Sequence, residues 1–290
     1  MRARLIVLLI SAAVAGISHA SAAAEPLPTF TYAPLPASAP PQHPFRNGSA
    51  FSIRLPGEVP VRGVFVAPAS DDGTKHPAVL WVHWLGEPAT TNHTEFAADA
   101  QALAATGVIS MLVDMPWSNP DWFSAGRTTS SDAADTVANV VALRRALDIL
   151  VALPSVDPAR IAYVGHDFGA MDGALLLAVD PRPQFAVLMA PTLSFWEWNL
   201  LGAQPRDPAA YVTQMSGFDL PGWLARGRQR ATLLQFGKND IYVSRATAAV
   251  FRNAVPDRDR TYKMYDADHA LDIPAAHVDR LAWLMKHLAH

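Results

Sequence analysis

The stretch from Ile161 to Ala170 constrains the fold of this chain more than any other. It reads IAYVGHDFGA, so an apolar run typical of a strand leads into GHDFG, and an Ala-rich segment with helical spacing follows. The two glycines of GHDFG remove side chains where the strand end and the helix start crowd together. This strand, sharp turn and helix predict that the side chain of Asp167 projects above the end of a sheet.

Asp167 occupies a position where such a turn usually carries serine, and two interpretations are open. A carboxylate at a helix N-terminus is stabilised by unpaired N–H groups and by the helix dipole without any catalytic purpose. The same carboxylate can serve as a nucleophile if an imidazole and a second acid lie within reach. The rest of the chain has to decide between these interpretations.

Composition limits the classes of function. The 290 residues are 50% hydrophobic, which is enough for one large core without disulfides or metals. The formal net charge is −3 and the basic residues are scattered, so we expect a small-molecule partner and neither nucleic acid nor an anionic membrane surface. Because the chain has no cysteine, thiol nucleophiles, disulfides and Cys-based metal sites are excluded.

The first 24 residues are typical of a secretory signal peptide. Two arginines precede an apolar run at 5–17, and residues 18–24 offer small residues for cleavage. The apolar run is short for a bilayer, which favours cleavage over an uncleaved anchor. We therefore expect a secreted or periplasmic protein with no membrane attachment after cleavage, whose residues 25–50 form a Pro-rich extended arm.

Strands and helices alternate through the remaining domain, residues 51–290. Strands are expected at 51–55, 61–67, 78–83, 108–114, 160–164, 185–189, 231–236 and 261–265, with helices between most of them. The first two strands form an antiparallel pair. The fold class is therefore α/β, with a mostly parallel sheet, helices on both faces, and a small lid-like insertion at 192–230.

Polar side chains follow several of the predicted strands. These are His83, Asp114, Asp167, Asp240 and His269, each at or just past a strand end. Because ligands of such sheets bind beyond the carboxyl ends of the strands, we expect these side chains to share one edge.

The order of Asp167, Asp240 and His269 resembles that of nucleophile, acid and histidine in the α/β-hydrolase superfamily, and the likeness covers nearly all of 51–290. SVDPARIAYVGHDFGA, LLQFGKNDIYV and MYDADHALD are similar to segments of the dienelactone hydrolase-like branch. GHDFGA resembles the elbow of epoxide hydrolases and haloalkane dehalogenases, which carry aspartate there. The resemblance implies an α/β-hydrolase fold with nucleophile Asp167, acid Asp240 and base His269.

The resemblance also implies an oxyanion hole built from two backbone N–H groups. One belongs to Phe168, which follows the nucleophile. The other lies in His83-Trp84-Leu85-Gly86, where the family has His-Gly-x-Pro, so either Leu85 or Trp84 is the donor. His83 and His166 are expected to be structural.

Departures from the family patterns narrow the substrate. Phe168 and Leu85 stand where dehalogenases hold the halide with side-chain donors, so dehalogenation is disfavoured. Epoxide hydrolases use tyrosines of the cap, and the insertion offers only Tyr211, with Tyr242 a weaker substitute. Arg127 either meets a substrate carboxylate or is a solvated loop residue.

Aromatic side chains of the insertion and of the preceding loops are candidates for the substrate-binding wall or for plain core. They include Trp117, Trp122, Phe123, Phe195, Trp196, Trp198 and Trp223. Trp117, Trp196 and Tyr211 are the predicted substrate contacts.

No metal and no cofactor are expected, because the histidines lack ligand spacing. The sequence thus predicts an exported hydrolase of a small organic ester, lactone or epoxide, with an unknown oligomeric state. The alternative is a non-catalytic binding protein in which Asp167 replaces the nucleophilic serine.

Overall fold

The computed structural model describes residues 27–33, 48, 50–53, 60–69, 73–256 and 260–289. The predicted signal peptide at 1–24 and most of the predicted arm at 25–50 lie outside these residues. Within the described part of the chain, none of the helices combines the length and the apolar character that crossing a bilayer requires.

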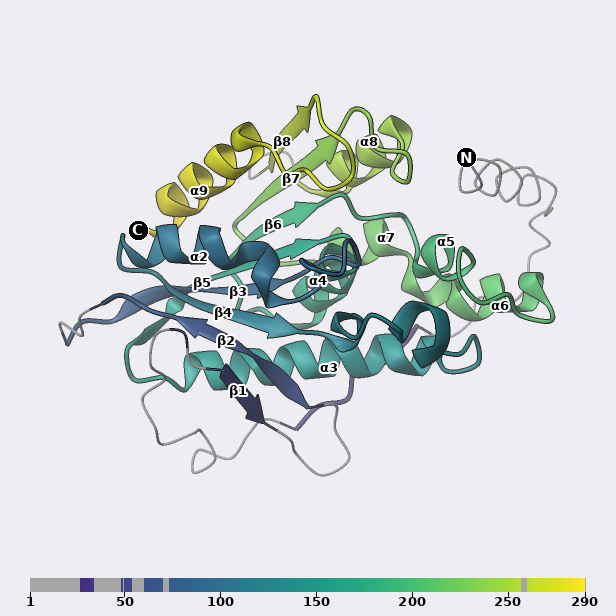
Figure 1. Cartoon of the computed structure of the whole chain (residues 1–290), viewed down its shortest axis with the longest axis horizontal. Coiled ribbons are helices and arrows are strands. Elements are labelled where there is room, and N and C mark those ends of the chain that lie inside the picture. The colour runs from purple at the N-terminus through teal and green to yellow at the C-terminus, as the bar shows by residue number, and fades with distance from the viewer. Residues whose placement is uncertain are drawn as a thin grey trace.

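One eight-stranded sheet forms the centre of the molecule, with the strand order β1-β2-β4-β3-β5-β6-β7-β8 (Figure 1). Neighbouring strands are parallel from β4 through β3 to β8, whereas β1 and β2 form an antiparallel edge. The strands are β1 (Ala50–Ile53), β2 (Val61–Val66), β3 (His76–Val82), β4 (Ile109–Asp114), β5 (Val156–His166), β6 (Phe185–Met189), β7 (Ala231–Gly237) and β8 (Arg260–Tyr265). The carboxyl ends of β3 and β5 to β8 therefore meet at one edge.

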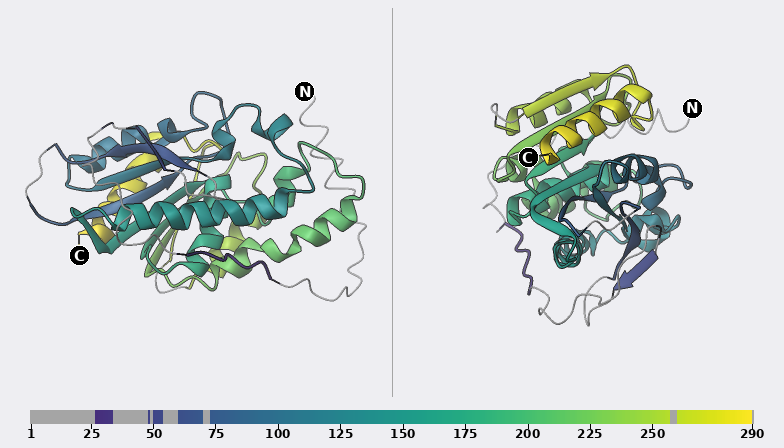
Figure 2. Two further views of the ribbon diagram at one scale, coloured as in Figure 1. Left: turned by 90° about the horizontal axis from the view of Figure 1, so that it is seen from below. Right: turned by 90° about the vertical axis from the view of Figure 1, so that its left-hand side faces the viewer.

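Helices cover both faces of the sheet, as the two views of Figure 2 show. One face carries α2 (Ala97–Ala104) and α9 (Pro274–Leu288), which contact each other. The other carries α3 (Asp132–Val151) and α4 (Phe168–Val179), with α8 (Arg245–Ala254) against β7. Because both faces are covered, the central strands are buried over most of their length, which explains their largely apolar sequences.

The segment at 192–230 leaves the sheet after β6 and returns at β7. It contains α5 (Phe195–Asn199), α6 (Pro208–Met215) and α7 (Leu220–Leu224), and α7 packs on α4. The described part of the arm, 27–33, is bound to this side of the molecule. The Arg144 guanidinium donates to Phe30 O (3.0 Å) and lies 4.1 Å from the centre of the Tyr32 ring, while Phe30 meets Trp223 edge-on at 5.5 Å.

The predicted α/β architecture is confirmed, and the differences concern element ends. A short 3₁₀ turn, η1 (His93–Phe96), precedes α2. Strand β5 begins at Val156 rather than at residue 160, because its first part pairs with His76 across a local irregularity.

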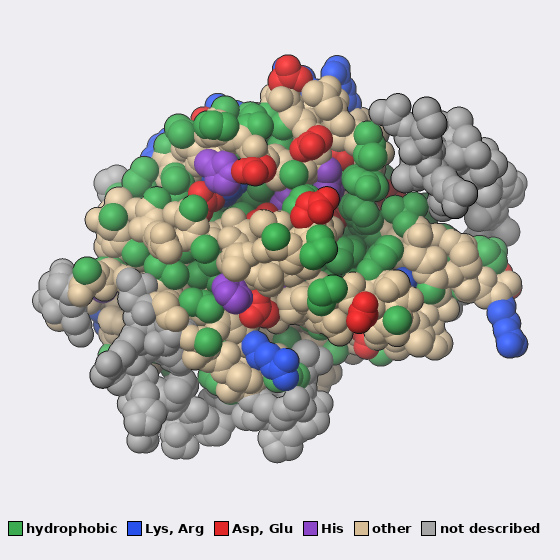
Figure 3. Space-filling model, viewed as in Figure 1, with side chains coloured by type: hydrophobic (Ala, Val, Ile, Leu, Met, Phe, Trp, Pro, Cys, Tyr) green, Lys and Arg blue, Asp and Glu red, His purple; other side chains and the backbone are tan. Residues whose placement is uncertain are grey.

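On the face shown in Figure 3, Lys and Arg side chains are scattered rather than gathered into one patch.

Candidate active site

Asp167 lies at the turn between β5 and α4 in a strained backbone conformation, with φ 50° and ψ −115°. The flanking glycines make this turn possible. A Cβ at Gly165 would lie 2.3 Å from Gly169 O, and a Cβ at Gly169 would lie 2.2 Å from Val82 O of β3. The strand and the helix therefore approach so closely that only glycine fits at either position.

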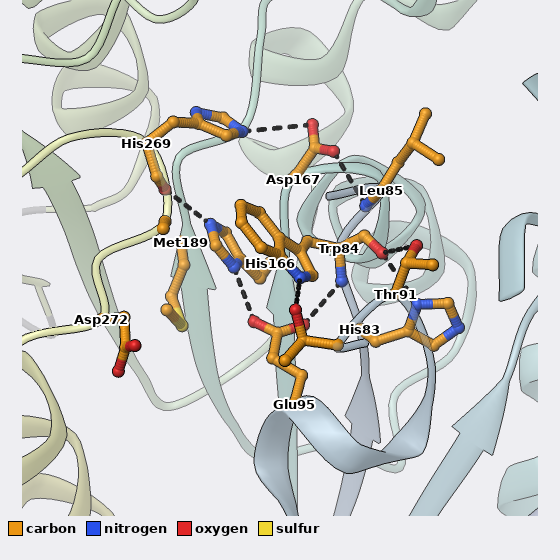
Figure 4. Close-up of polar contacts among 12 residues, drawn as sticks. His83, Trp84, Leu85, Thr91, Glu95, His166, Asp167, Met189, His269 and Asp272 are labelled. Carbon is orange, nitrogen blue, oxygen red and sulfur yellow. Dashed lines mark hydrogen bonds and ion pairs between the residues drawn. The ribbon is translucent and has the colours of Figure 1, made fainter. Parts of the chain in front are cut away.

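Asp240 and His269 reach the same edge from the loops after β7 and β8. His269 Nδ1 lies 2.7 Å from Asp240 Oδ2, which leaves Nε2 facing Asp167 Oδ1 at 3.7 Å (Figure 4). The second Asp240 oxygen accepts from the backbone N–H groups of Tyr242 and Val243. The structure thus brings the three predicted side chains together, and we call them, with Leu85 N, the strand-edge site.

The protonation of His269 is governed by two carboxylates. Burial alone would lower the pKa of His269, but the neighbouring carboxylates of Asp167 and Asp240 outweigh it and raise that pKa from 6.5 to about 9. With this pKa, His269 is an imidazolium at neutral pH.

Leu85 supplies the backbone donor of the loop after β3. Its N–H lies 3.1 Å from Asp167 Oδ2, whereas Trp84 N donates to Glu95 Oε2 at 2.7 Å. Of the two alternatives left by the sequence, only Leu85 therefore points at Asp167. Phe168 begins α4, where helix N–H groups have no intrahelical acceptor, and its role as the second donor stays a prediction.

The Trp84–Leu85 peptide is held in this orientation from the other side. Trp84 O accepts from Thr91 Oγ1 (3.0 Å) and from His83 Nδ1 (2.8 Å). Because the C=O and N–H of one trans peptide point in opposite directions, these bonds direct Leu85 N–H toward Asp167.

His83 serves this loop as a neutral imidazole. Burial lowers its pKa to about 4, against smaller raising effects such as the bond to Trp84 O. Its Nε2 accepts from Met115 N (3.0 Å), so its Nδ1 carries the proton donated to Trp84 O. This geometry agrees with the structural role predicted for His83.

Aromatic rings surround the His269 imidazole. The Trp198 ring centre lies 5.4 Å from that of His269 and 4.7 Å from that of Tyr242, which itself lies 5.3 Å from His269. Trp198 Nε1 is buried with no hydrogen-bond partner among the described residues. Trp198 is the insertion residue that reaches the site, whereas the predicted contact Trp196 is a partly buried side chain packed against the core.

Two other predicted contacts serve the structure. Tyr211 OH donates to Asp132 and accepts from Asn199 Nδ2, so it offers no free hydroxyl to a substrate. Trp117 is 0% exposed and donates to His83 O, packing behind Phe168 rather than lining an open wall.

Arg127 is likewise engaged, which corrects both interpretations of it. Its guanidinium pairs with both Asp132 oxygens and donates to Asn199 O. We call Arg127, Asp132, Asn199 and Tyr211 the lid-anchor cluster. Each of the three guanidinium nitrogens has an acceptor in the cluster and the side chain is 1% exposed, so Arg127 is a buried partner of Asp132 and not a solvated loop residue.

Glu95 is a site residue that the sequence analysis misses. It accepts from Trp84 N and contacts His166, but nothing in its local sequence pattern distinguishes it from a solvated glutamate.

Among the described residues, no group of three His, Cys, Asp or Glu side chains could hold a metal ion. A pocket of about 260 Å³ lined by Arg62, Asp114 and residues of α3 shares no residue with the strand-edge site.

Comparisons of the whole chain agree with this architecture. No family model and no curated protein sequence matches the chain. Solved structures do match over 83% of it. The first is a 2,6-dihydroxy-pseudo-oxynicotine hydrolase, with a TM-score of 0.64, 15% identity and 68% of that chain covered.

Two further structures are covered over 98% of their own length. One is a Klebsiella pneumoniae protein assigned as a dienelactone hydrolase, with a TM-score of 0.60 and 17% identity. The other is the esterase domain of a Rhodothermus marinus protein, with a TM-score of 0.61 and 14% identity. The chain has the α/β-hydrolase fold. The α/β-hydrolase fold that the predicted resemblance implies is thereby confirmed.

Proposed function

We propose that this α/β-hydrolase-fold protein is a hydrolase in which Asp167 forms a covalent ester with an sp3 carbon of a small substrate, most suitably an epoxide. One observation carries the proposal: the two Asp167 oxygens have different environments. Oδ2 accepts from Leu85 N, whereas Oδ1 faces His269 and has no hydrogen-bond partner among the described residues. The free oxygen is available for attack, and the bound one is placed to become the ester carbonyl oxygen.

The charge on His269 suits the first step. Asp167 Oδ1 attacks an epoxide carbon, the carbon–oxygen bond breaks, and the departing oxygen takes a proton from His269 Nε2. Because the pKa of His269 is raised to about 9, this proton is present at neutral pH. An acid is thus available without Tyr211, whose hydroxyl is bound in the lid-anchor cluster.

Ester formation then prepares the second step. It removes the negative charge of Asp167, one of the two carboxylates that raise the pKa of His269, so neutral His269 can accept a proton from water. That water attacks Asp167 Cγ while Leu85 N, with Phe168 N, stabilises the oxyanion. Collapse breaks the Cγ–Oδ1 bond, and the leaving alkoxide takes the proton of the new hydroxyl on Cγ. A diol is released, Asp167 returns as a carboxylate and His269 as an imidazolium, so that epoxide plus water gives diol.

Esters and lactones are the second candidate class. The 3.7 Å between His269 Nε2 and Asp167 Oδ1 also suits a bridging water, which the two side chains could direct at a carbonyl carbon. This route avoids the mixed anhydride that direct attack by Asp167 would form. It would bring the protein closer to the esterases whose fold it shares.

The surroundings of the site favour a small, uncharged and partly aromatic substrate. Asp167 is 0% exposed and His269 is 6% exposed, and Trp198 and Tyr242 pack against the imidazole. A substrate therefore needs a rearrangement of these rings to enter, and bulky molecules are disfavoured. With Arg127 engaged by Asp132, no guanidinium there selects for a carboxylate.

The decisive experiment traps the intermediate on a variant that cannot hydrolyse it. His269→Gln is incubated for hours with racemic styrene oxide, long enough for alkylation slowed by loss of the acid to finish. We expect a mass increase of one epoxide on the peptide containing Asp167, and none in Asp167→Asn/His269→Gln. Turnover of an ester panel by wild type without any adduct would favour the water-directing route. If wild type turns over neither esters, lactones nor epoxides, the non-catalytic alternative replaces both.

Export is part of the proposal. We infer it from the basic, apolar and small-residue pattern of residues 1–24. Expression with this segment in a Gram-negative host should yield a periplasmic protein that begins within or just after 18–24, measured by intact mass. An unprocessed, membrane-retained chain would contradict the proposal.

A further inference from the structure

A second acid–imidazole pair lies beside the strand-edge site. Glu95 of η1 contacts His166, the last residue of β5, with 2.6 Å between Oε1 and Nδ1. His166 is 0% exposed, and the Trp84 indole stacks on its ring at 5.1 Å with 7° between the planes. Sequence patterns give this pair no role beyond structure.

The pair joins the two backbone segments on which the site depends. Glu95 Oε2 accepts from Trp84 N at 2.7 Å, and His166 Nε2 lies 2.9 Å from His269 O (Figure 4). Trp84 precedes Leu85, whose N–H contacts Asp167, and His269 carries the proposed acid and base. A chain of three polar contacts therefore runs from the oxyanion loop to the histidine loop beneath Asp167.

The acceptors around His166 determine which of its ring nitrogens is protonated. His269 O can only accept, so His166 Nε2 must donate to it. The contact between His166 Nδ1 and Glu95 Oε1 then contains one shared proton, either as imidazolium with carboxylate or as neutral imidazole with carboxylic acid. Without that proton, one of the two contacts of His166 would set a lone pair against an oxygen.

We propose that Glu95 and His166 are positioning residues, which together hold Leu85 N–H on Asp167 and hold the His269 loop at its distance from Asp167. Neither side chain touches the reacting atoms. Their effect is on the alignment of the oxyanion donor with the base. The kinetic consequence rests on the proposed function, whereas the geometry of the pair does not.

The kinetic test compares two substitutions of one residue. Glu95→Gln preserves the contacts, since an amide oxygen can accept from Trp84 N and an amide N–H can donate to His166 Nδ1. Glu95→Leu removes both. We expect Glu95→Leu to slow hydrolysis of the styrene oxide adduct by about 100-fold with little change in KM, because small misplacements at a reacting centre have effects of this size. Glu95→Gln should recover most of that rate.

Glu87→Leu is the matched control, since Glu87 is an exposed glutamate of the loop between β3 and η1. It should behave as wild type. Equal adduct hydrolysis by Glu95→Leu and wild type, with only stability reduced, would overturn the proposal, and so would failure of Glu95→Gln to recover the rate.

A substrate-free readout separates this proposal from the proposed function. Nitrogen-15 NMR of histidine-labelled wild type should show His166 Nε2 protonated, and the same in Glu95→Gln. An unprotonated Nε2 would contradict the pair even if activity is normal. If wild type forms no adduct at all, the proposed function fails. The NMR result still tests the positioning proposal in that case. A His269 ring signal that changes in Glu95→Leu and not in Glu95→Gln would support the positioning proposal.

Discussion

The strand-edge site and the lid-anchor cluster are both buried groups of polar side chains, but they differ in whether their charged side chains are hydrogen-bonded to each other. In the cluster, the Arg127 guanidinium, both Asp132 oxygens and the Tyr211 hydroxyl are hydrogen-bonded, and only Asn199 Oδ1 has no partner among the described residues. In the strand-edge site, Asp167 Oδ1 and His269 Nε2 face each other without a hydrogen bond, although both are buried.

The difference separates structure from chemistry. Buried polar atoms are normally satisfied, and a carboxylate whose two oxygens are both bound, as in Asp132, cannot attack a ligand. Unpartnered buried atoms reduce stability, as does the strained backbone of Asp167 with its φ of 50°. A loss of stability of this kind is expected at a site where a substrate or a water molecule supplies the missing hydrogen-bond partners.

The largest predicted effect is a loss of turnover on substitution of Asp167. It is compared with substitution of one residue of the lid-anchor cluster. Asp167→Asn removes the nucleophile and should lower turnover of styrene oxide by at least about 10⁴-fold. Tyr211→Phe, a matched loss of one polar group in the lid-anchor cluster, should leave turnover within a few-fold of wild type. Steady-state kinetics of both variants provide the measurement. Similar losses in the two variants would erase the distinction between the regions.

Asp240→Asn should have the next largest effect. An asparagine cannot hold the Nδ1 proton as the carboxylate does at 2.7 Å, so Nε2 can be left in the wrong protonation state for the reaction. We expect a loss of roughly 10³-fold in the hydrolytic step. Stopped-flow analysis should find the adduct accumulating. An unchanged rate of adduct hydrolysis would remove Asp240 from the account.

The lid-anchor cluster should affect the stability of the protein more than its turnover. Tyr211→Phe leaves Asn199 Nδ2 without its acceptor and removes one donor from Asp132, which should reduce the free energy of unfolding by about 1–3 kcal/mol. Urea denaturation measures this. No loss of stability would mean that the lid-anchor cluster does not fasten the insertion.

The pH dependence of stability isolates the His269 charge. Its pKa is raised from 6.5 to about 9 on folding, so its stabilising effect is complete below pH 6.5 and is lost as the pH rises through about 9. In Asp167→Asn one of the two carboxylates is gone, and the loss should be smaller by about 1–2 kcal/mol. Unfolding titrations from about pH 6 to about pH 10 should show the difference in stability between the two proteins changing by that amount. Parallel curves would contradict the charged state assigned to His269.

The last prediction concerns Asp172 of α4, a buried carboxyl with no partner for either oxygen among the described residues. Burial raises its pKa well above 3.8, so it stabilises the fold less as the pH rises above that value. Asp172→Asn should therefore be more stable than wild type near neutral pH, and the advantage should vanish near about pH 4. Thermal denaturation at the two pH values tests this. A deficit at both would mean that the carboxyl has an unseen partner.

The sequence allowed the fold and the strand-edge residues to be predicted for one physical reason. Strand periodicity and loop position place Asp167, Asp240 and His269 at ends of parallel strands, and parallel strands share an edge. The glycines of GHDFG carry the same kind of local information, since the turn cannot form around a Cβ.

The remaining contacts depend on which side chains meet across the fold. Tyr211 and Asp132 are 79 positions apart, so their bond leaves no local pattern. The choice between Trp196 and Trp198 depends on the rotation of a five-residue helix, and the choice between Trp84 and Leu85 depends on Glu95, His83 and Thr91. None of these is encoded in spacing alone.

A single turnover in oxygen-18 water tests the central claim most directly, with wild-type protein in excess over styrene oxide and both product and protein analysed by mass spectrometry. The account predicts that the label enters the Asp167 carboxylate, because water attacks Cγ, and that the first diol formed contains only unlabelled oxygen. Label in the diol and none in Asp167 would contradict covalent catalysis by this residue.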